Sequence, residues 1–454
     1  MRLTIIHPCI GRRAGHRHAD YIRTWQMEPL PAAVVAGLTP RDVEIRFYDD
    51  RLEALPLDEP TDLVAISTET YTAKRAYQIA SDYRRRRVPV VMGGFQATLV
   101  PDEVADYADA VVVGEAEDLW PHVLDDFRAC RLQKFYRAAE RPSLRNLRPA
   151  RGIFRGKRYL PIGLIEAGRG CHFKCEFCAV QSYFGATQTR RSPDDILREV
   201  AQLRDTRRLF FFVDDNITSN LAEAKEFFRT LTPLRIRWVS QASINAAHDD
   251  EFLRLIRASG CQGLLVGFET LNPDNLAAMN KRFNTMRGGY DQALANLRRH
   301  NLRVYGTFIF GYDADSPASF TDAVDFATQH GFFIAAFNHL TPFPGTPLYD
   351  RLHRERRLRY ERWWLDDAYR YNEVPFTPAS MSAGELADRC VGARRRFYSW
   401  TGIARRALDR VNRSEPRMWW NYFLINAMHR ADVSGRDRYP LGDEAWKGPL
   451  LKAT

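Results

Sequence analysis

Between Gly170 and Cys178 the chain reads GCHFKCEFC, a stretch that holds three of its seven cysteines. Their spacing is Cys-x3-Cys-x2-Cys, at Cys171, Cys175 and Cys178. At the cysteine frequency of this chain, chance produces only about 0.002 such triplets, so the grouping needs a cause. Three thiolates on an iron–sulfur cube leave one iron without a protein ligand, and an open coordination position is typical of a catalytic metal site. The stretch therefore predicts a reactive metal centre.

Two other interpretations of these cysteines are open but fit less well. A structural zinc site would use the three thiolates and His172, but zinc modules usually pair two Cys-x2-Cys motifs, and the sequence has no second one. Inert buried thiols are disfavoured by the polar Lys174 and Glu176 between them. The remaining cysteines are scattered and are predicted to be small buried apolar residues: Cys9, Cys130, Cys261 and Cys390.

Strand patterns alternate with helix patterns on both sides of the cysteine stretch. Residues 1–130 predict a doubly wound, Rossmann-like α/β domain with a parallel sheet. Residues 131–158 lose this periodicity and are predicted to be a linker. Residues 159–350 contain six strand patterns, the cysteines following the first of them, and predict a partial (βα)6 barrel of the TIM type with its chemistry at the carboxyl ends of the strands. Residues 351–454 are predicted to form an α-helical C-terminal segment.

With this placement, the cysteine stretch resembles the radical S-adenosylmethionine (SAM) superfamily. The resemblance covers roughly residues 160–350 and implies a [4Fe–4S] cluster on Cys171, Cys175 and Cys178. It also implies that SAM binds the fourth iron through its amino and carboxylate groups and is cleaved reductively to a 5′-deoxyadenosyl radical. An electron donor such as flavodoxin or ferredoxin is implied as a partner.

The strand ends that follow carry the residues that this resemblance assigns to SAM. A carboxylate at such a position can accept hydrogen bonds from an ammonium group or from ribose hydroxyls. Helix capping by the aspartates, a surface salt bridge of the glutamate and a bulge at the glycine are the alternatives. The residues are Asp214 and Asp215 after the second strand, Gln241 and Ser243 at the third, Glu269 at the fourth and Gly311 at the fifth.

The run 341–349 and the strand ends of the first domain resemble the subclass of radical SAM enzymes with an N-terminal cobalamin-binding domain. Paired glycines let the backbone approach a flat macrocycle closely, and small hydroxyl groups can satisfy its amide side chains. The Asp-x-His-x-x-Gly loop that supplies a cobalt ligand in other cobalamin proteins is absent, so a protein histidine on cobalt is not expected. A retained scaffold domain without cobalamin is the alternative. The implied corrin contacts are Ser67, Thr68, Gly93, Gly94, Gln96, Gly114 and Glu115.

Composition excludes several other classes of protein. Hydrophobic residues make up 45% and charged residues 27%, as in a soluble globular enzyme. The start of the chain has no signal-peptide pattern, and few cysteines suit a reducing compartment, so we expect a cytoplasmic protein. Of the formal charge of +10, an excess of six lies after residue 380, so the charge gives no reason to expect nucleic-acid binding.

The C-terminal segment is rich in arginine and aromatic residues. Its arginines, including Arg394 and Arg395, favour an anionic substrate, because guanidinium groups match oxyanions. The stretch 418–428 could lie on a membrane surface, although we do not expect membrane contact. Several aromatics are predicted to cover the barrel mouth and exclude water, with ordinary packing as the alternative: Trp363, Trp364, Tyr369, Tyr371, Trp419 and Trp420.

Together these features predict an oxygen-sensitive radical SAM enzyme that acts on a small molecule of the natural-product type. The preferred reaction is methylation, or a related modification, of an unactivated carbon with the help of cobalamin. The first alternative is cobalamin-independent radical chemistry: cyclisation, hydroxyl-type insertion or aminocarboxypropyl transfer from SAM. The second is a corrinoid or metal sensor without turnover.

Overall fold

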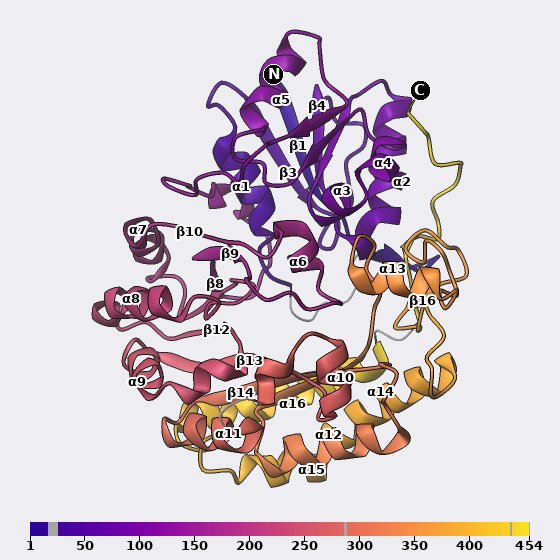
Figure 1. The fold of residues 1–454 in the computed structure, drawn as a ribbon. Helices are drawn as coiled ribbons and strands as arrows, with labels where there is room; N and C mark the ends of the chain where they lie inside the picture. Colours follow the sequence, from indigo (N-terminus) through magenta and orange to yellow (C-terminus); the bar gives the residue numbers. More distant parts are fainter. Residues whose placement is uncertain (17–25, 286–287, 436–437, 454) are drawn as a thin grey trace.

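The computed structural model describes residues 1–16, 26–285, 288–435 and 438–453 (Figure 1). An α/β domain built from the first third of the chain lies above a half-open barrel, and the C-terminal part runs along the barrel and returns to the first domain. Within the described residues, no helix combines the length and the apolar character needed to cross a bilayer.

The first domain is a parallel sheet of six strands with helices on both faces, as predicted. In chain order its strands are arranged 2-1-3-4-5-6, so the strand order reverses between β1 and β4. Ligands bind at such a reversal, beyond the carboxyl ends of the strands. Helices α1 and α5 pack on one face of the sheet, and α2 and α4 on the other. The strands are β3 (Glu44–Asp49), β1 (Arg2–His7), β4 (Leu63–Ser67), β5 (Val90–Gly93), β6 (Ala110–Val113) and β7 (Phe135–Arg137), and the helices are α1 (Leu30–Leu38), α2 (Ala73–Arg85), α4 (Pro101–Ala105) and α5 (Trp120–Arg128).

The predicted linker, residues 131–158, is wrong in part. Strand β7 lies inside it and pairs with β6 as the last strand of the first sheet. Phe154, near its end, is buried against the face of the sheet that α1 covers. A strand of three residues is too short to show a periodic pattern, so the first domain extends further along the chain than its sequence pattern indicates.

The second domain confirms the predicted partial (βα)6 barrel. Its six strands are parallel and lie in the order of the chain, and within the described residues no pairing joins the last strand back to the first. The outer face of the sheet packs against a layer of helices. The strands are β8 (Ile162–Ile165), β11 (Leu209–Phe212), β12 (Trp238–Ala242), β13 (Cys261–Glu269), β14 (Arg303–Phe310) and β15 (Ile334–His339), and the helices are α7 (Pro193–Leu203), α8 (Leu221–Leu231), α9 (Asp250–Ala258), α11 (Gly289–Arg299) and α12 (Pro317–Gln329).

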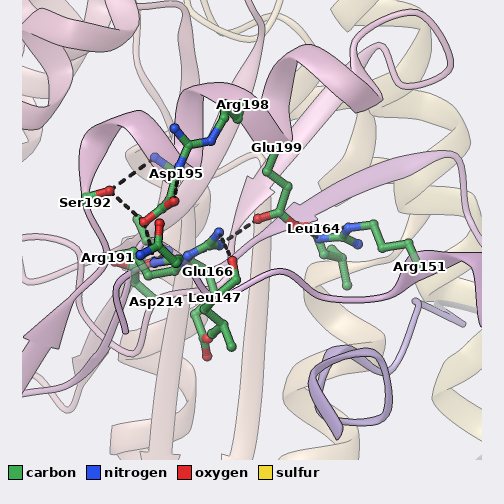
Figure 2. Close-up of polar contacts among 12 residues, drawn as sticks. Leu147, Arg151, Leu164, Glu166, Arg191, Ser192, Asp195, Arg198, Glu199 and Asp214 are labelled. Atoms are coloured by element: carbon green, nitrogen blue, oxygen red, sulfur yellow. Dashed lines mark hydrogen bonds and ion pairs between the residues drawn. The ribbon is translucent and has the colours of Figure 1, made fainter. Parts of the chain in front are cut away.

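Buried polar contacts fasten the first barrel strand to the amino end of α7 (Figure 2). Ser192 caps this helix, as its sequence pattern predicts. The neighbouring Arg191 donates to Glu199 at 2.6 Å and to the carbonyl of Glu166, just beyond β8, at 3.0 Å. Arg151 reaches the same Glu199 at 3.0 Å. The carboxyl end of β8, which leads to the cysteine stretch, is therefore fixed to α7 through Arg191 and Glu199.

The predicted helical segment 351–454 contains helices, but it is not helical throughout. Helix α13 ends at Arg354, and β16 (Arg370–Tyr371) lies between it and α14. The chain then returns to the first domain, where β18 (Gly442–Asp443) pairs with β2 (Gly11–Arg12). The helices are α13 (Pro347–Arg354), α14 (Ala383–Phe397), α15 (Trp400–Ala407) and α16 (Pro416–Gly435).

The prediction that the aromatic pairs cover the barrel mouth is wrong. Trp363 and Trp364 are buried in the core that α2 and α4 of the first domain form, and Trp364 Nε1 donates to Glu103 Oε1 at 2.8 Å. Trp420 is 70% exposed on α16. An indole whose N–H finds a buried acceptor can pack fully inside a core, so ordinary packing explains the pair.

Three of the four scattered cysteines are buried, as predicted, but Cys130 is exposed. It lies two residues after α5, in the left-handed backbone region with a φ of 54°. Its position in a turn at the surface explains the failure of that prediction.

Candidate active site

The cysteine stretch lies between the two domains, at the carboxyl end of β8 (Figure 1). It follows β9 (Gly168–Gly170), which pairs with β10 (Gln188–Arg190) in a hairpin, and it leads into α6 (Ala179–Phe184). Cys175 is buried, and Cys171 and Cys178 are partly exposed. Burial raises the pKa of Cys178, and the neighbouring Cys171 raises it further. Cys171 and Cys178 likewise raise the pKa of Cys175, so the three thiols lie close enough to influence one another.

The arrangement differs from that of a site for one metal ion. Across the described ranges, no three His, Cys, Asp or Glu side chains converge enough to hold a single ion. A zinc site needs its four ligands around one ion, and His172 instead bonds Ser219, with 2.8 Å between Nδ1 and Oγ. A [4Fe–4S] cube spreads its thiolate ligands over separate irons, so three thiols that lie near one another on one loop fit the cluster.

The two adjacent aspartates hold the backbone that leads into the cysteine stretch. Asp214 Oδ1 accepts a hydrogen bond from the N–H of Ala167 at 2.8 Å, and Asp215 Oδ2 accepts one from that of Gly170 at 2.7 Å. Burial raises the pKa of Asp214 to about 7. Both carboxylates thus position the cysteine loop, and their expected contact with the methionine ammonium of SAM stays a prediction.

Asn216 connects the first cysteine to the third barrel strand. Its Nδ2 group donates to Cys171 Sγ at 3.4 Å and to Ser243 Oγ at 2.8 Å. Gln241, two residues before Ser243, donates from Nε2 to the carbonyl of Asp214 at 3.3 Å. The structure therefore brings the predicted Gln241 and Ser243 to the cysteine loop. Asn216 was not among the site residues predicted from the sequence.

The fourth strand brings a buried ion pair to the cysteines. Glu269 lies at a bulge in β13 with a φ of 63°, and its Oε1 is 2.6 Å from Lys281 Nζ. The Lys281 ammonium acts against the burial that raises the pKa of Cys175, so it lies near that thiol. Lys281 was not predicted, because no sequence pattern marks a buried lysine three residues after a short helix, α10 (Pro273–Ala278). Glu269 is thus engaged in a salt bridge that is buried, and not at the surface.

Gly311, the last of the residues that were assigned to SAM, packs against the C-terminal segment. Its φ is 115°, and its N–H donates to Asp315 at 2.7 Å. A Cβ atom here would meet Leu386 and Phe376 of the C-terminal segment, each at 2.9 Å. The glycine is therefore needed for close packing at this strand end, and its contact with SAM stays a prediction.

A cavity of about 240 Å³ lies at the carboxyl edge of the first sheet. Gly94, with a φ of 97°, lies on its rim, and a Cβ atom there would meet the backbone of Thr68 at 2.8 Å. At Gly114 a Cβ atom would meet nothing within 4 Å, so the backbone faces open space. An apolar part of the cavity extends between the sheet and α1. Of the expected corrin contacts, the lining includes Ser67, Gly93, Gly94, Gly114 and Glu115, and its apolar part includes Ile5, Val35, Ala65, Val91, Val112 and Trp120.

Two of the expected corrin contacts lie outside this lining. Thr68 is fully buried behind Gly94. Gln96 is also fully buried, and its Nε2 donates to Glu103 at 3.0 Å, in the core that Trp364 shares. Both side chains therefore pack in the core next to the cavity wall and do not line the cavity.

Aromatic contacts join this cavity to the cysteine stretch. Tyr183 and Phe184 of α6, the helix that begins directly after Cys178, line the cavity. The Tyr183 ring lies 4.6 Å from that of Phe95, which follows Gly94. The helix after the last cysteine thus forms one wall of the cavity in the first domain.

The Radical SAM superfamily pattern matches residues 165–327, and the pattern for the N-terminal part of radical SAM proteins matches residues 73–154. A bacteriochlorophyllide d C-12(1)-methyltransferase of Chlorobaculum tepidum is 30% identical over 415 residues, which cover 88% of this chain and 89% of that protein. The chain belongs to the radical SAM superfamily. It falls in the subclass with an N-terminal cobalamin-binding domain.

Further similarities agree with this membership of the radical SAM superfamily. A bacteriochlorophyllide d C-8(2)-methyltransferase of the same organism is 28% identical over 351 residues, covering 74% of this chain and 78% of that protein. The solved structure of the cobalamin-dependent SAM radical enzyme OxsB shares the fold, with a TM-score of 0.65 at 12% identity over 95% of this chain and 72% of that chain.

The radical SAM membership confirms that the chain is an enzyme and that its cofactors include a [4Fe–4S] cluster and SAM. The relatives are enzymes, so nothing in these comparisons supports the alternative of a sensor without turnover. As in other members of the superfamily, the substrate is a small molecule.

Proposed function

We propose that this radical SAM enzyme methylates an unactivated carbon of a small-molecule substrate, with cobalamin in the first domain as the methyl carrier. The observation that carries the proposal is the wall shared by the two sites: α6 begins at the last cysteine and lines the first-domain cavity with Tyr183 and Phe184. Two relatives that are methyltransferases, and the shared fold of OxsB, whose structure holds aqua-cobalamin, support the same function.

The residues divide between three ligands. Cys171, Cys175 and Cys178 would hold the cluster. Gln241 and Ser243, which bond Asp214 and Asn216 beside the cysteine loop, would contact SAM, while Asp214, Asp215 and Glu269 shape the site around it. Gly93, Gly94 and Gly114, with Ser67 beside them, would face the corrin ring. The apolar part of the cavity, between the sheet and α1, would hold the nucleotide tail of cobalamin.

When bound, the cluster supplies the electron that cleaves SAM, and cobalamin supplies the methyl group. The chain itself supplies orientation and protection. Tyr183 and Phe184 keep the shared wall apolar, and Glu115 and Glu117 pair with Arg169 where the domains meet. Exclusion of water from the space between the two sites would prevent side reactions of a carbon radical.

The proposal extends to partners and location. We expect flavodoxin or ferredoxin as the electron donor, because reductive cleavage needs a single-electron source. We expect a cytoplasmic protein, because a cluster with an open iron and free thiols suits a reducing compartment. The substrate is proposed to carry an oxyanion that an arginine of the C-terminal segment recognises.

Anaerobic reconstitution tests the cluster and its chemistry. The wild-type chain should bind about four irons and four sulfides and should release 5′-deoxyadenosine from SAM under reduction. Cys175→Ala should lose the cluster, whereas Cys130→Ala, at an exposed cysteine outside the loop, should keep it. A Cys175→Ala variant that retains the full iron content would overturn the ligand assignment. A chain that forms 5′-deoxyadenosine but takes up no cobalamin would favour the cobalamin-independent alternative.

A further inference from the structure

A second cavity, of about 530 Å³, lies inside the barrel, toward the amino ends of its strands. Residues of all six strands line it, together with residues of α16. Two of its lining residues, Val239 and Leu265, lie two residues before Gln241 and Gly267 on their strands, and residues two apart on a strand face the same side. The cavity is therefore adjacent to the residues at the carboxyl ends of these strands, where the cysteine loop lies. Its size suits an organic ligand. The apolar lining includes Ile162, Leu209, Phe211, Val239, Leu265, Ile334 and Ala336 from the strands and Met418, Ile425 and Val433 from α16.

One arginine enters this cavity across the open edge of the barrel. Strand β15 is the edge strand, and α14 packs beside it. Tyr398 Oη donates to the carbonyl of Ala335 at 2.8 Å and accepts from its N–H at 3.2 Å. Arg394, one turn earlier, donates from Nε to the carbonyl of Phe337 at 3.0 Å. Because Nε is used on the strand edge, the two Nη groups remain for the cavity that Arg394 lines.

Arg394 differs from two other arginines of α14, which have carboxylate partners. Arg389 pairs with Glu385 at 2.8 Å and Arg396 with Asp325 at 2.5 Å. Among the described residues, no carboxylate forms an ion pair with Arg394, whose one bond named above is to a backbone carbonyl. A guanidinium in an apolar cavity is costly without an anion beside it.

The other charged or titratable groups in or near the cavity have interactions of their own or are uncharged. Arg303 is bound to the carbonyl of Gln262 and to Ser414 Oγ. His339 lies near Arg394, and burial lowers its pKa to about 4, so it is neutral at physiological pH. Asp432 lines the cavity from α16 and has an interaction of its own. A ligand oxyanion would therefore complete the environment of Arg394.

We propose that the barrel cavity binds the apolar body of the substrate and that Arg394 binds an oxyanion, a carboxylate or its equivalent, at the end of the substrate remote from the cluster. The proposal rests on the function proposed above, and it deepens that function by naming the substrate class: an amphiphilic organic anion. Arg394 is distinguished from Arg395, its exposed neighbour outside this cavity. Bidentate recognition of an oxyanion by a guanidinium gives orientation as well as affinity.

Two fluorescent probes test the proposal on the reconstituted full-length chain. Anilinonaphthalene sulfonate carries an apolar aromatic body and an oxyanion, and N-phenylnaphthylamine has the same body without the charge. Arg394→Gln keeps an N–H donor for Phe337 but removes the charge, and Arg395→Gln is the matched control. We expect the dissociation constant of the anionic probe to rise about tenfold in Arg394→Gln and to stay unchanged in Arg395→Gln. The neutral probe should bind all three chains equally.

Three results would overturn the proposal. The first is unchanged binding of the anionic probe by Arg394→Gln. The second is a parallel loss of both probes in that variant, which would show that Arg394 only supports the strand edge. The third is unaltered binding of both probes in Ala336→Trp, which fills the cavity, since the probes would then bind elsewhere. Probe binding requires no turnover, so failure here is distinguishable from failure of the proposed methylation.

Discussion

Arg169 and Glu117 form an ion pair of 2.6 Å across the junction of the two domains, with side chains that are 12% and 6% exposed. Arg169 lies on β9, two residues before the first cysteine, and Glu117 lies beyond the carboxyl end of β6. The same guanidinium is 3.2 Å from Glu115 Oε1 and 2.8 Å from Glu166 Oε2. One cation therefore serves three carboxylates where the first-domain cavity meets the cysteine hairpin.

Removing this cation should loosen the junction. Arg169→Gln leaves the buried Glu117 carboxylate without its cation, and breaking a buried pair costs roughly 3–5 kcal/mol. Urea unfolding of the reconstituted chain should therefore show a large loss of stability. The control is Arg396→Gln, whose guanidinium and its partner Asp325 are both at least half exposed, and this change should cost at most about 1 kcal/mol. Equal small losses in both variants would show that the junction does not depend on Arg169.

Asn216 should tune the reduction potential of the cluster. A hydrogen bond to a ligating sulfur stabilises the reduced cluster, and the Asn216 amide lies 3.4 Å from Cys171 Sγ. We expect Asn216→Ala to lower the midpoint potential by an amount on the order of tens of mV, measured by redox titration followed by electron paramagnetic resonance. Asn220→Ala, which removes only the cap of α8, should leave the potential unchanged. A potential that is the same in Asn216→Ala and the wild type would refute this function.

The Glu269–Lys281 pair should behave as one unit. Lys281→Met leaves a buried carboxylate unpaired beside the cysteines and should cost roughly 3–5 kcal/mol of stability. The double variant Glu269→Gln/Lys281→Met has no unpaired charge and should regain most of that loss, as a double-mutant cycle in urea would measure. Additive losses would mean that the two side chains act independently.

Asp214 should make the stability of the chain depend on pH. Burial raises its pKa from 3.8 to about 7, so the folded chain binds this proton more tightly than the unfolded chain. Its favourable contribution is complete below pH 3.8 and is lost as the pH rises through 7. Asp214→Asn removes this loss, so the variant should gain stability relative to the wild type between about pH 5 and about pH 8. Parallel stability curves over that range would contradict the assignment.

Tyr398 should stabilise the open edge of the barrel. Its hydroxyl satisfies both the N–H and the carbonyl of Ala335 on the edge strand, and Tyr398→Phe leaves both groups unpaired. The expected cost is about 1–3 kcal/mol, measured by denaturant unfolding. Tyr360→Phe, on a half-buried tyrosine, serves as the control for loss of a hydroxyl. No loss of stability in Tyr398→Phe would show that solvent satisfies this edge.

The sequence predicts most of the architecture because the strands are short apolar runs separated by amphipathic helices. The run Leu63–Ile66 and its neighbours lie in strands, and Ser192 caps its helix as predicted. What failed depends on contacts distant in sequence. Strand β7 has only three residues, and Trp364 finds its acceptor at Glu103, 261 residues away. Neither feature has a local pattern.

The candidate site divides in the same way. Three cysteines at a fixed spacing and carboxylates at strand ends are local patterns, so the loop and its surroundings could be predicted. Lys281 could not be predicted, because a buried lysine looks in the sequence like any surface cation. The sequence indicated Arg394 and Arg395 together, and only the structure separates the one that lines the barrel cavity from the exposed one. Gln96 was assigned from its position after a glycine pair, yet its side chain turns inward to Glu103.

The central claim is that the first-domain cavity holds cobalamin beside the cluster, and cobalt content tests it most directly. The chain purified anaerobically from cobalamin-fed cells should contain about one cobalt per chain together with its iron. Ala65→Phe, which places a ring in the apolar part of that cavity, should lose the cobalt and keep the iron. A wild-type chain that contains iron but no cobalt, or an Ala65→Phe variant with undiminished cobalt, would contradict the claim.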